Sequence, residues 1–326
     1  MLSIIDNHTD PYWNLAAEEY LLGRFDCPVF RLWRNSAAVI VGRNQNARAE
    51  INQNYLDSHG IALVRRLSGG GAVYHDLGNV NYTFLDACSR NENTSDMFRR
   101  FTAPVISALA KLGVEAKLEG RNDLTIGGSK FSGNAIYVRS GRIMHHGTML
   151  FDTDMEEMAA ALSTDTSKFT SKAVESRRSH VTNILSHLAE PMTPAEFMAF
   201  IGQEISAEAE PYGYTQEDLQ AIDLLAERKY RKAEWNFAAG PAYSYCKTEK
   251  FPCGTLTLTA KIEKGIIEGL AITGDYFFSL NTREFCEAMR GCPATQEKIA
   301  ERASQLPFGD YFNGITLEEL CSLFII

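Results

Sequence analysis

Residues 65–76 read Arg65-Arg66-Leu67-Ser68-Gly69-Gly70-Gly71-Ala72-Val73-Tyr74-His75-Asp76, with three consecutive glycines between an arginine pair and an alternating segment. Glycine adopts backbone conformations that other residues avoid, and its lack of a side chain lets N–H groups approach a ligand closely. Guanidinium groups add fixed positive charge and donors that suit phosphate or carboxylate oxygens. Because a tight turn needs only one or two glycines, we interpret this stretch as an anion-binding loop. It is neither a P-loop nor a GxGxxG fingerprint, since the residues that complete those motifs are missing.

A second dense segment, residues 120–135, places Lys130 among small residues. A lysine in a cleft of small side chains can reach phosphoryl and carboxyl oxygens, and it neutralises the charge that builds up in acyl-phosphate chemistry. We therefore interpret Lys130 as a functional residue. Asn122-Asp123 is compatible with a plain turn. Equally, Asp123 could help to hold a divalent metal or orient Lys130, and the sequence leaves these possibilities open.

The composition is that of an ordinary globular protein with a sizeable core. The chain has 326 residues, a formal charge of −9, 45% hydrophobic and 22% charged residues. The negative charge argues against bulk binding of nucleic acid. No run of 18 apolar residues predicts a membrane span, and the N-terminus lacks a signal pattern, so we expect a cytoplasmic location. The seven cysteines form no CxxC pair, which favours neither a zinc site nor a disulfide framework.

Apolar periodicity predicts the main elements. One predicted helix follows Pro11. Four more cover residues 98–112, 155–162, 194–205 and 216–228. The predicted strands cover residues 29–33, 37–41, 61–64, 80–85, 114–118, 130–138 and 142–151. Pro104 lies inside one helical pattern, so that helix is either kinked there or begins near Thr102. Together these elements predict a large mixed sheet with flanking helices.

Two further stretches indicate a long loop and a domain boundary. Residues 163–180 are polar and poorly periodic, and we expect a long functional loop there. Residues 238–241 mark a domain boundary, which gives a catalytic domain over 1–243 and a small accessory domain over 250–326. The accessory domain is predicted to be α+β, with strands at 255–259 and 266–272 and helices at 282–289, 296–303 and 317–323.

Neither of the two histidine-containing motifs predicts a catalytic group. His145 and His146 are adjacent on a predicted strand, so their side chains point to opposite faces and at most one lines a pocket. His75-Asp76 lacks a neighbouring nucleophile of known context, so we expect a structural role for it.

Taken together, these motifs resemble the lipoate–protein ligase A family of the biotin/lipoate protein ligase superfamily. The resemblance covers essentially the whole chain and rests on residues 10–19, 65–76, 120–124, 130–135, 145–148, 181–183 and 235–237. It implies an α+β fold: a mixed-sheet catalytic domain like those of biotin protein ligases and class II aminoacyl-tRNA synthetases, followed by a small α+β accessory domain.

The resemblance also implies an activity. Lipoate and ATP, with Mg²⁺, would give lipoyl-AMP, and the lipoyl group would then pass to one lysine of a protein acceptor. The implied acceptors are the lipoyl domains of 2-oxoacid dehydrogenase acyltransferase subunits and glycine cleavage H protein. No nucleic acid or membrane partner is expected, and the chain is expected to be a monomer.

The site residues follow from the same motifs. Contacts to ATP or the adenylate are expected from Arg66, Ser68, Gly70, Gly71, Ala72, Val73, Tyr74, Asn79, Asn122, Asp123, Lys130 and Val181. Contacts to lipoate are expected from Lys130, Gly71, Gly133, Ala135, His146 and Gly147. Lys130 is the expected catalytic residue, and Asp123 is the expected ligand of Mg²⁺.

Other functions are less well supported. Acyltransferases that hold the acyl group on a cysteine thiolate are disfavoured, because residues 89–245 contain no cysteine. Biotin ligation is not supported by these motifs. A transferase that uses preformed lipoyl-AMP and a non-catalytic sensor of lipoate or nucleotide remain alternatives.

Overall fold

The computed structural model describes residues 1–45, 47–88, 92–162, 181–237, 245–252, 254–263, 265–275, 280–312 and 314–324. The chain divides into two compact units. Unit 1 comprises Met1–Ile40, Glu50–Val64 and Val73–Asn236, and unit 2 comprises Val41–Ala49, Arg65–Ala72 and Phe237–Ile326. The predicted loop at 163–180 and the predicted boundary at 238–241 lie outside the described residues.

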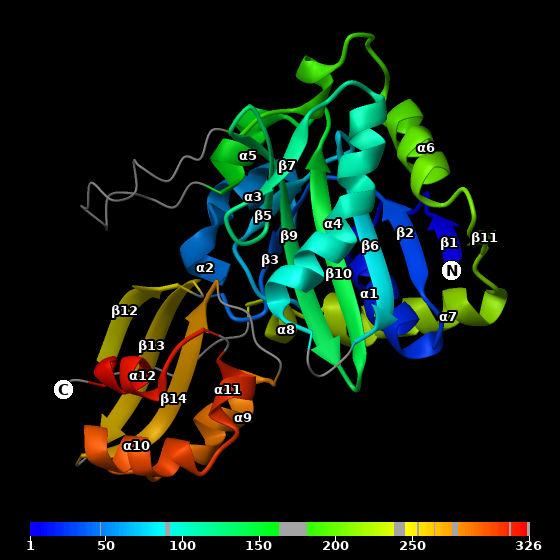
Figure 1. Cartoon of the computed structure of the whole chain (residues 1–326). Helices are drawn as coiled ribbons and strands as arrows, with labels where there is room; N and C mark the ends of the chain where they lie inside the picture. The colour runs from blue at the N-terminus through cyan, green and yellow to red at the C-terminus, as the bar shows by residue number, and fades with distance from the viewer. Residues whose placement is uncertain are drawn as a thin grey trace. The chain divides into compact units, whose positions relative to one another are not determined.

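An eight-stranded mixed sheet forms the centre of unit 1 (Figure 1). Its order is β11-β1-β2-β6-β10-β9-β8-β7, with β1 parallel to both of its neighbours and antiparallel pairing from β2 onward. The strands are β1 Leu2–Ile5, β2 Val29–Trp33, β6 Asn79–Ala87, β7 Ala116–Glu119, β8 Asp123–Ile126, β9 Ser129–Arg139, β10 Arg142–Leu150 and β11 Glu210–Pro211. The mixed sheet is therefore confirmed.

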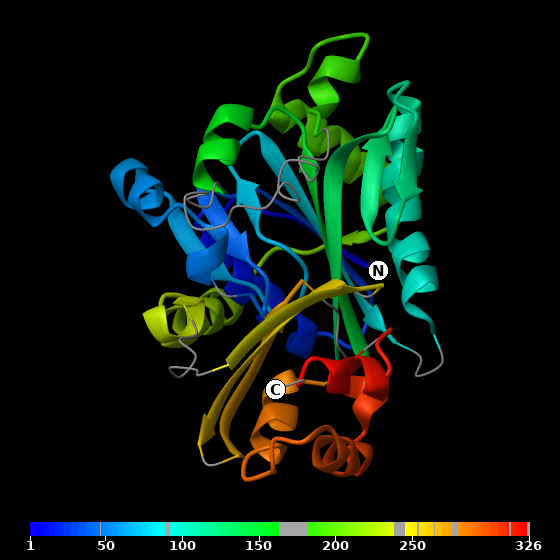
Figure 2. The same cartoon turned by 90° about the vertical axis from the view of Figure 1, so that its left-hand side faces the viewer.

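Helices cover both faces of this sheet (Figures 1 and 2). The face here called the α1 face is covered by α1 (Pro11–Arg24), on which α7 (Gln216–Leu225) packs. The opposite face, the α4 face, is covered by α4 (Thr94–Lys111) and α6 (Pro194–Ile205). Aromatic side chains fill this second layer, with ring centroids 5.6 Å apart for Phe84 and Phe101 and 4.3 Å apart for Phe151 and Phe197.

Capping residues set the starts of the helices. The Asp10 side chain accepts from the Tyr12 N–H at 2.9 Å, which begins α1 directly before Pro11. Asn93 accepts from the Asp96 N–H at 2.9 Å and begins α4 at Thr94. The alternative start near Thr102 is therefore wrong: α4 runs through Pro104, because the cap and its buried apolar side chains offset the one hydrogen bond that proline cannot make.

Shorter elements complete unit 1. A three-stranded sheet has the order β4-β3-β5, with β3 Ala38–Val41, β4 Ala62–Arg65 and β5 Val73–His75. The remaining helical segments are α3 Gln53–His59, α5 Met155–Ala161, η3 Ile184–His187, η4 Ala226–Tyr230 and α8 Ala233–Phe237, whereas most of the short helix α2 Ala47–Glu50 belongs to unit 2. The Thr215 capping box confirms the predicted start of α7, which ends at Leu225 because the next turn widens into the π-helix η4.

The C-terminal part of unit 2 is a small α+β layer structure, as predicted. Its antiparallel sheet has the order β12-β13-β14, with β12 Tyr245–Phe251, β13 Gly254–Glu263 and β14 Ile266–Gly274. Its helices are α9 Thr282–Ala288, α10 Gln296–Ser304, α11 Phe308–Tyr311 and α12 Leu317–Ser322. Leu256, Leu258, Phe285 and Ile299 are fully buried between these layers, so this segment has a core of its own.

Candidate active site

Polar side chains collect on the α1 face of the large sheet. Asn79, Asn81 and Thr83 of β6 and His146 and Thr148 of β10 are all at most 8% exposed. Thr148 lies opposite Asn81 in the register, and His146 lies opposite Thr83. The same face brings together these predicted site residues: Asn79, Asp123, Lys130, Gly133, Ala135 and His146.

A β-bulge turns Lys130 onto this face. In a regular strand Lys130 would share a face with Ser132 and point away from Gly133. Leu124 of β8 pairs with Ser132, but the next residue of β8 pairs with Lys130, so Phe131 is an extra residue in β9. Such a bulge re-aims the neighbouring side chain, and here it places the lysine on the α1 face.

Lys130 contacts two of the predicted residues. Its Nζ lies 2.7 Å from Asp123 Oδ1, with the two side chains 31% and 37% exposed. A Cβ placed on Gly133 would lie 3.4 Å from Cε and Nζ of Lys130, so the lysine extends across this glycine. The backbone of Lys130 also forms a parallel bridge with Val181. Because the ammonium is partly exposed, it can exchange the Asp123 carboxylate for an incoming anion.

Glu18 of α1 is a buried partner of His146 that the motifs did not reveal. Its carboxylate oxygens lie 3.0 and 3.1 Å from His146 Nδ1, and one accepts a 2.6 Å hydrogen bond from the Thr83 hydroxyl. The Trp33 indole N–H donates to the same hydroxyl at 2.9 Å. Burial alone would raise the pKa of Glu18, but His146, Thr83 and Arg31 hold it below its ordinary value. A carboxylate is therefore held ionised beside His146.

The signal for Glu18 was present in the sequence. Glu18 is three residues after Leu15 and four before Leu22, and both leucines are buried. It thus occupies the apolar stripe of an amphipathic helix, where a charged residue needs a partner.

Gly147 and Asn122 belong to a polar cluster that reaches the α4 face. A Cβ on Gly147 would lie 2.6 Å from the Tyr82 hydroxyl and 2.3 Å from Asn134 Oδ1. Tyr82 donates to that same Asn134 oxygen. Asn122 Nδ2 donates to the Asn134 carbonyl at 2.5 Å, while Asn134 Nδ2 donates back to the Asn122 carbonyl at 3.0 Å. Glycine is required at 147 because a buried hydrogen-bonded pair occupies the space of a side chain.

His145 points to the α4 face, so the two adjacent histidines lie on opposite faces as predicted. Its ring is fully buried and packs on Phe98, Phe101 and Tyr82, with centroid distances of 5.7, 5.2 and 5.8 Å. Neither ring nitrogen has a hydrogen-bond partner among the described residues. Burial, reinforced by His146, lowers the pKa of His145 to about 3, so this imidazole is neutral.

The glycine-rich loop belongs to unit 2, where Arg65 and Arg66 brace it. Arg65 Nη1 donates to three carbonyls, those of residues 42, 43 and 45, at 2.7 to 3.1 Å. Burial, followed by Arg43, lowers the pKa of Arg65 to about 10. Arg66 donates from Nε to Ser68 Oγ at 3.0 Å and from Nη2 to the carbonyls of residues 69 and 71 at 2.7 and 2.8 Å. The arginines thus fix the backbone around the glycines.

Two glycines make the tight packing of this loop possible. A Cβ on Gly42 would lie 2.0 Å from the Gly70 carbonyl oxygen and 3.4 Å from Arg66 Nη2. Gly70 has φ of +90°, a conformation that side chains disfavour. Gly71 is exposed and Ala72 half-buried, so the end of the loop remains accessible.

The residues after the loop belong to unit 1. Val73 and Tyr74 lie on β5, and Tyr74 is buried with its hydroxyl donating to Glu157 of α5. Burial and Glu157 raise the pKa of Tyr74, so the phenol stays protonated. His75 lies 3.0 Å from Asn35 Nδ2 through its Nδ1, which fits the structural role expected for it.

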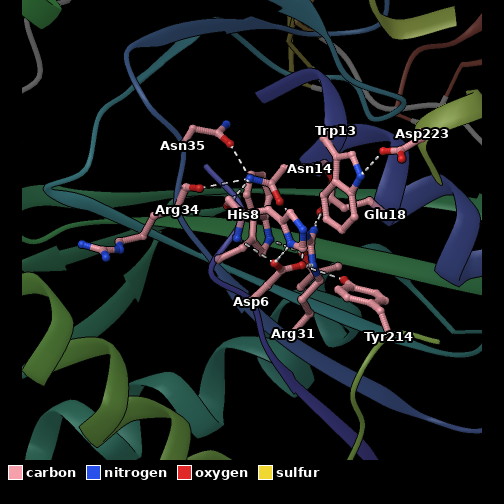
Figure 3. Close-up of polar contacts among 12 residues, drawn as sticks. Asp6, His8, Trp13, Asn14, Glu18, Arg31, Arg34, Asn35, Tyr214 and Asp223 are labelled. Carbon is pink, nitrogen blue, oxygen red and sulfur yellow. Dashed lines mark hydrogen bonds and ion pairs between the residues drawn. The ribbon is translucent and has the colours of Figure 1, made fainter. Parts of the chain in front are cut away.

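A buried ion pair anchors α1, and with it Glu18 (Figure 3). Arg31 Nη2 lies 2.7 Å from Asp6 Oδ2, and Arg31 Nη1 donates to the Asn14 carbonyl at 3.1 Å. Tyr214 donates to the same Asp6 oxygen at 2.7 Å. Burial opposes ionisation, but Arg31 and these hydrogen bonds lower the pKa of Asp6 to about 2. A hollow of about 320 Å³ lies beside this network, lined by residues 4–8 and 212–214, and includes none of the predicted site residues.

Two features are absent from the described residues. They contain no group of three or more His, Cys, Asp or Glu side chains placed to hold a metal ion. None of their helices is both long and apolar enough to cross a membrane.

Comparison with protein families gives two matches. Residues 10–206 match the lipoyl protein ligase A/B catalytic domain, and residues 240–324 match the bacterial lipoate protein ligase C-terminus.

Curated relatives extend over nearly the whole chain. Lipoate–protein ligase 1 of Staphylococcus aureus is 39% identical over 322 residues, covering 98% of each chain. Lipoate-protein ligase LplJ of Bacillus subtilis is 37% identical over 329 residues, again covering 98% of each chain.

Solved structures share the fold. LipL1 of P. falciparum in complex with lipoate has a TM-score of 0.77 at 24% identity and covers 98% of each chain. A lipoate-protein ligase A bound with ATP has a TM-score of 0.61 at 27% identity, covering 72% of this chain and 97% of its own. A bipartite lipoate protein ligase studied with its E2 lipoyl domain, from Thermoplasma acidophilum, has a TM-score of 0.64 at 27% identity, covering 74% and 98%. The chain belongs to the lipoate–protein ligase A family and is a ligase.

Proposed function

We propose that this ligase carries out both half-reactions of ATP-dependent lipoylation. In the first, an oxygen of the lipoate carboxylate attacks the α-phosphorus of ATP, a P–O bond breaks, and pyrophosphate leaves. In the second, the ε-amine of an acceptor lysine attacks the carbonyl carbon of lipoyl-AMP, an amide forms, and AMP leaves with the bonding electron pair. Activation is needed because a free carboxylate has a poor leaving group, whereas AMP leaves readily.

The observation that carries this proposal is the placement of Lys130. The bulge at Phe131 turns it onto a polar sheet face, where it lies across Gly133 and pairs with Asp123 at 2.7 Å. A cation held there can stabilise negative charge on the α-phosphate and on the acyl oxygen in both steps. Asp123 orients this lysine before substrate binds.

The other predicted residues take complementary roles. Arg66, Ser68, Gly70, Gly71, Ala72, Val73, Tyr74, Asn79, Asn122 and Val181 are proposed to contact ATP or the adenylate. Gly71, Gly133, Ala135, His146 and Gly147 are proposed to contact lipoate. The family likeness supports these roles, as does the crystal structure of a relative bound with ATP.

The residues present fit a magnesium ion delivered with the nucleotide. Mg²⁺ is usually held by one or two carboxylates together with substrate phosphates rather than by an all-protein cage. Asp123 uses Oδ1 for Lys130, which leaves Oδ2 as the candidate ligand. When bound, the ion would neutralise charge on the phosphates.

We propose as acceptors the lipoyl domains of 2-oxoacid dehydrogenase acyltransferase subunits and glycine cleavage H protein. The Thermoplasma ligase studied with its E2 lipoyl domain supports the first of these. We also propose that the enzyme is cytoplasmic and monomeric.

Mass spectrometry of an acceptor domain tests the proposal. The chain is incubated with that domain and lipoate, with or without MgATP, and in a parallel reaction with synthetic lipoyl-AMP alone. A complete ligase modifies one lysine in the MgATP reaction and in the lipoyl-AMP reaction. Modification only with lipoyl-AMP would show a transferase, and no modification in either would show a binding protein.

A further inference from the structure

Two neighbouring amide side chains on β6 lack complete hydrogen bonding. Asn79 Nδ2 donates to Asn81 Oδ1 at 2.8 Å. The other two amide atoms, Asn79 Oδ1 and Asn81 Nδ2, have no partner among the described residues, although the two side chains are 0% and 2% exposed. Buried polar groups are nearly always paired, because leaving one unpaired is costly. A pair kept in this state points to a ligand that completes it.

Thr148 lies directly opposite Asn81 in the register of β10 and β6. Its hydroxyl oxygen accepts the Gly133 N–H at 3.1 Å. The hydroxyl proton has no acceptor among the described residues, so Thr148 offers a donor on the α1 face.

Lys130 continues this line of donors. Its ammonium lies over Gly133, the residue whose N–H contacts Thr148. The ammonium, the Thr148 hydroxyl and the Asn81 amide thus stand over three adjacent strands, β9, β10 and β6. Adjacent strands lie about 4.8 Å apart, so each donor is one strand away from the next. Three donors without an acceptor among them suit a group that only accepts, and an ionised carboxylate is such a group.

We infer that Asn81 and Thr148 bind the carboxylate of the acyl substrate together with Lys130. This inference rests on the proposed function. Lys130, Thr148 and Asn81 donate to the carboxylate oxygens, and they keep contact with the oxygen that becomes the carbonyl oxygen of the adenylate. Asn79 is a positioning residue. Because Asn79 Nδ2 donates to Asn81 Oδ1, the Asn81 amide is oriented with its own Nδ2 toward the substrate. Asn79 Oδ1 is an acceptor and takes no part in holding a carboxylate.

Asn81→Leu tests the inference, since leucine has a similar volume and no donor. The measurements are the affinities for lipoate and for ATP, each titrated alone by calorimetry, and the urea midpoint of the full chain. We expect lipoate affinity to fall about 10- to 100-fold, the range for a lost hydrogen bond to a charged group. ATP affinity should stay within twofold. The urea midpoint reports the cost to folding separately, because the change removes the unpaired Asn81 Nδ2 but also takes the acceptor from Asn79 Nδ2.

Thr148→Val is the second variant, and it should also lower the affinity for lipoate but not the affinity for ATP. Its matched control is Thr102→Val, since Thr102 is also buried but donates to the Phe98 carbonyl of its own helix at 2.7 Å. Lipoate affinity within twofold of the wild type in both Asn81→Leu and Thr148→Val would overturn the inference and leave these side chains a structural role. If the wild type itself failed to bind lipoate, the proposed function would fall, and this inference with it.

Discussion

Replacing His145 by leucine should remove a pH-dependent loss of stability from unit 1. The His145 imidazole is fully buried in an aromatic cluster, and its pKa is about 3 against 6.5 in the unfolded chain. Below pH 6.5 the unfolded chain takes up a proton that the folded chain refuses until about pH 3. Stability is therefore present above pH 6.5 and falls as the pH drops through this window. At pH 5 the difference is 1.5 pH units, which corresponds to about 2 kcal/mol.

Urea unfolding at pH 8 and pH 5 measures this loss. All three tryptophans, Trp13, Trp33 and Trp235, lie in unit 1, so their fluorescence reports its unfolding. His145→Leu should lose about 2 kcal/mol less than the wild type between the two pH values. At pH 8 it should be at least as stable as the wild type, because two unpaired buried nitrogens have been removed.

Phe98→Leu is the matched control, since it alters the same ring cluster but keeps the imidazole. It should be less stable than the wild type at both pH values and show the wild-type difference between them. Equal pH dependence in His145→Leu and the wild type would show that burial of His145 is not the source of the loss of stability at low pH.

Two glycine substitutions probe the other parts of the site. Gly42→Ala places a Cβ 2.0 Å from the Gly70 carbonyl oxygen, so the loop must shift. We expect the ATP affinity measured by calorimetry to fall by about tenfold or more, while lipoate affinity stays within twofold. Unchanged ATP affinity would count against a nucleotide-binding role for the loop. Gly147→Ala places a Cβ 2.6 Å from the buried Tyr82 hydroxyl. It should lower the free energy of unfolding of unit 1, measured in urea, by about 1–3 kcal/mol. A wild-type urea midpoint would show that the Tyr82–Asn134 pair can move at no cost.

The fold was predictable where apolar patterns were long. The periodicity of α1, α6 and α7 located these helices to within a few residues. The short strand β8 was missed because residues 122–123 are typical of a turn, and β12 because most of its side chains are exposed. Such strands are defined by pairing with distant segments, which a local pattern does not contain.

The motifs identify candidate site residues but not their geometry. The motifs named Lys130 and Gly133, yet their common face depends on the bulge at Phe131, which arises from pairing with β8. Polar and apolar residues alternate over 79–84, but the apolar run over 80–85 predicts only a strand and not its polar face. The partnership of Glu18 with His146 joins residues 128 positions apart, and no local signal gives it.

Lipoate-dependent exchange of pyrophosphate into ATP, without any acceptor protein, tests whether this chain activates lipoate and whether Lys130 takes part. The comparison is between the wild type, Lys130→Ala and Lys117→Ala, the last removing an exposed lysine of the same sheet. We expect exchange by the wild type and Lys117→Ala, and a loss of about 100- to 1,000-fold in Lys130→Ala. A folded wild type without exchange would contradict the activation step, and full exchange by Lys130→Ala would remove Lys130 from it.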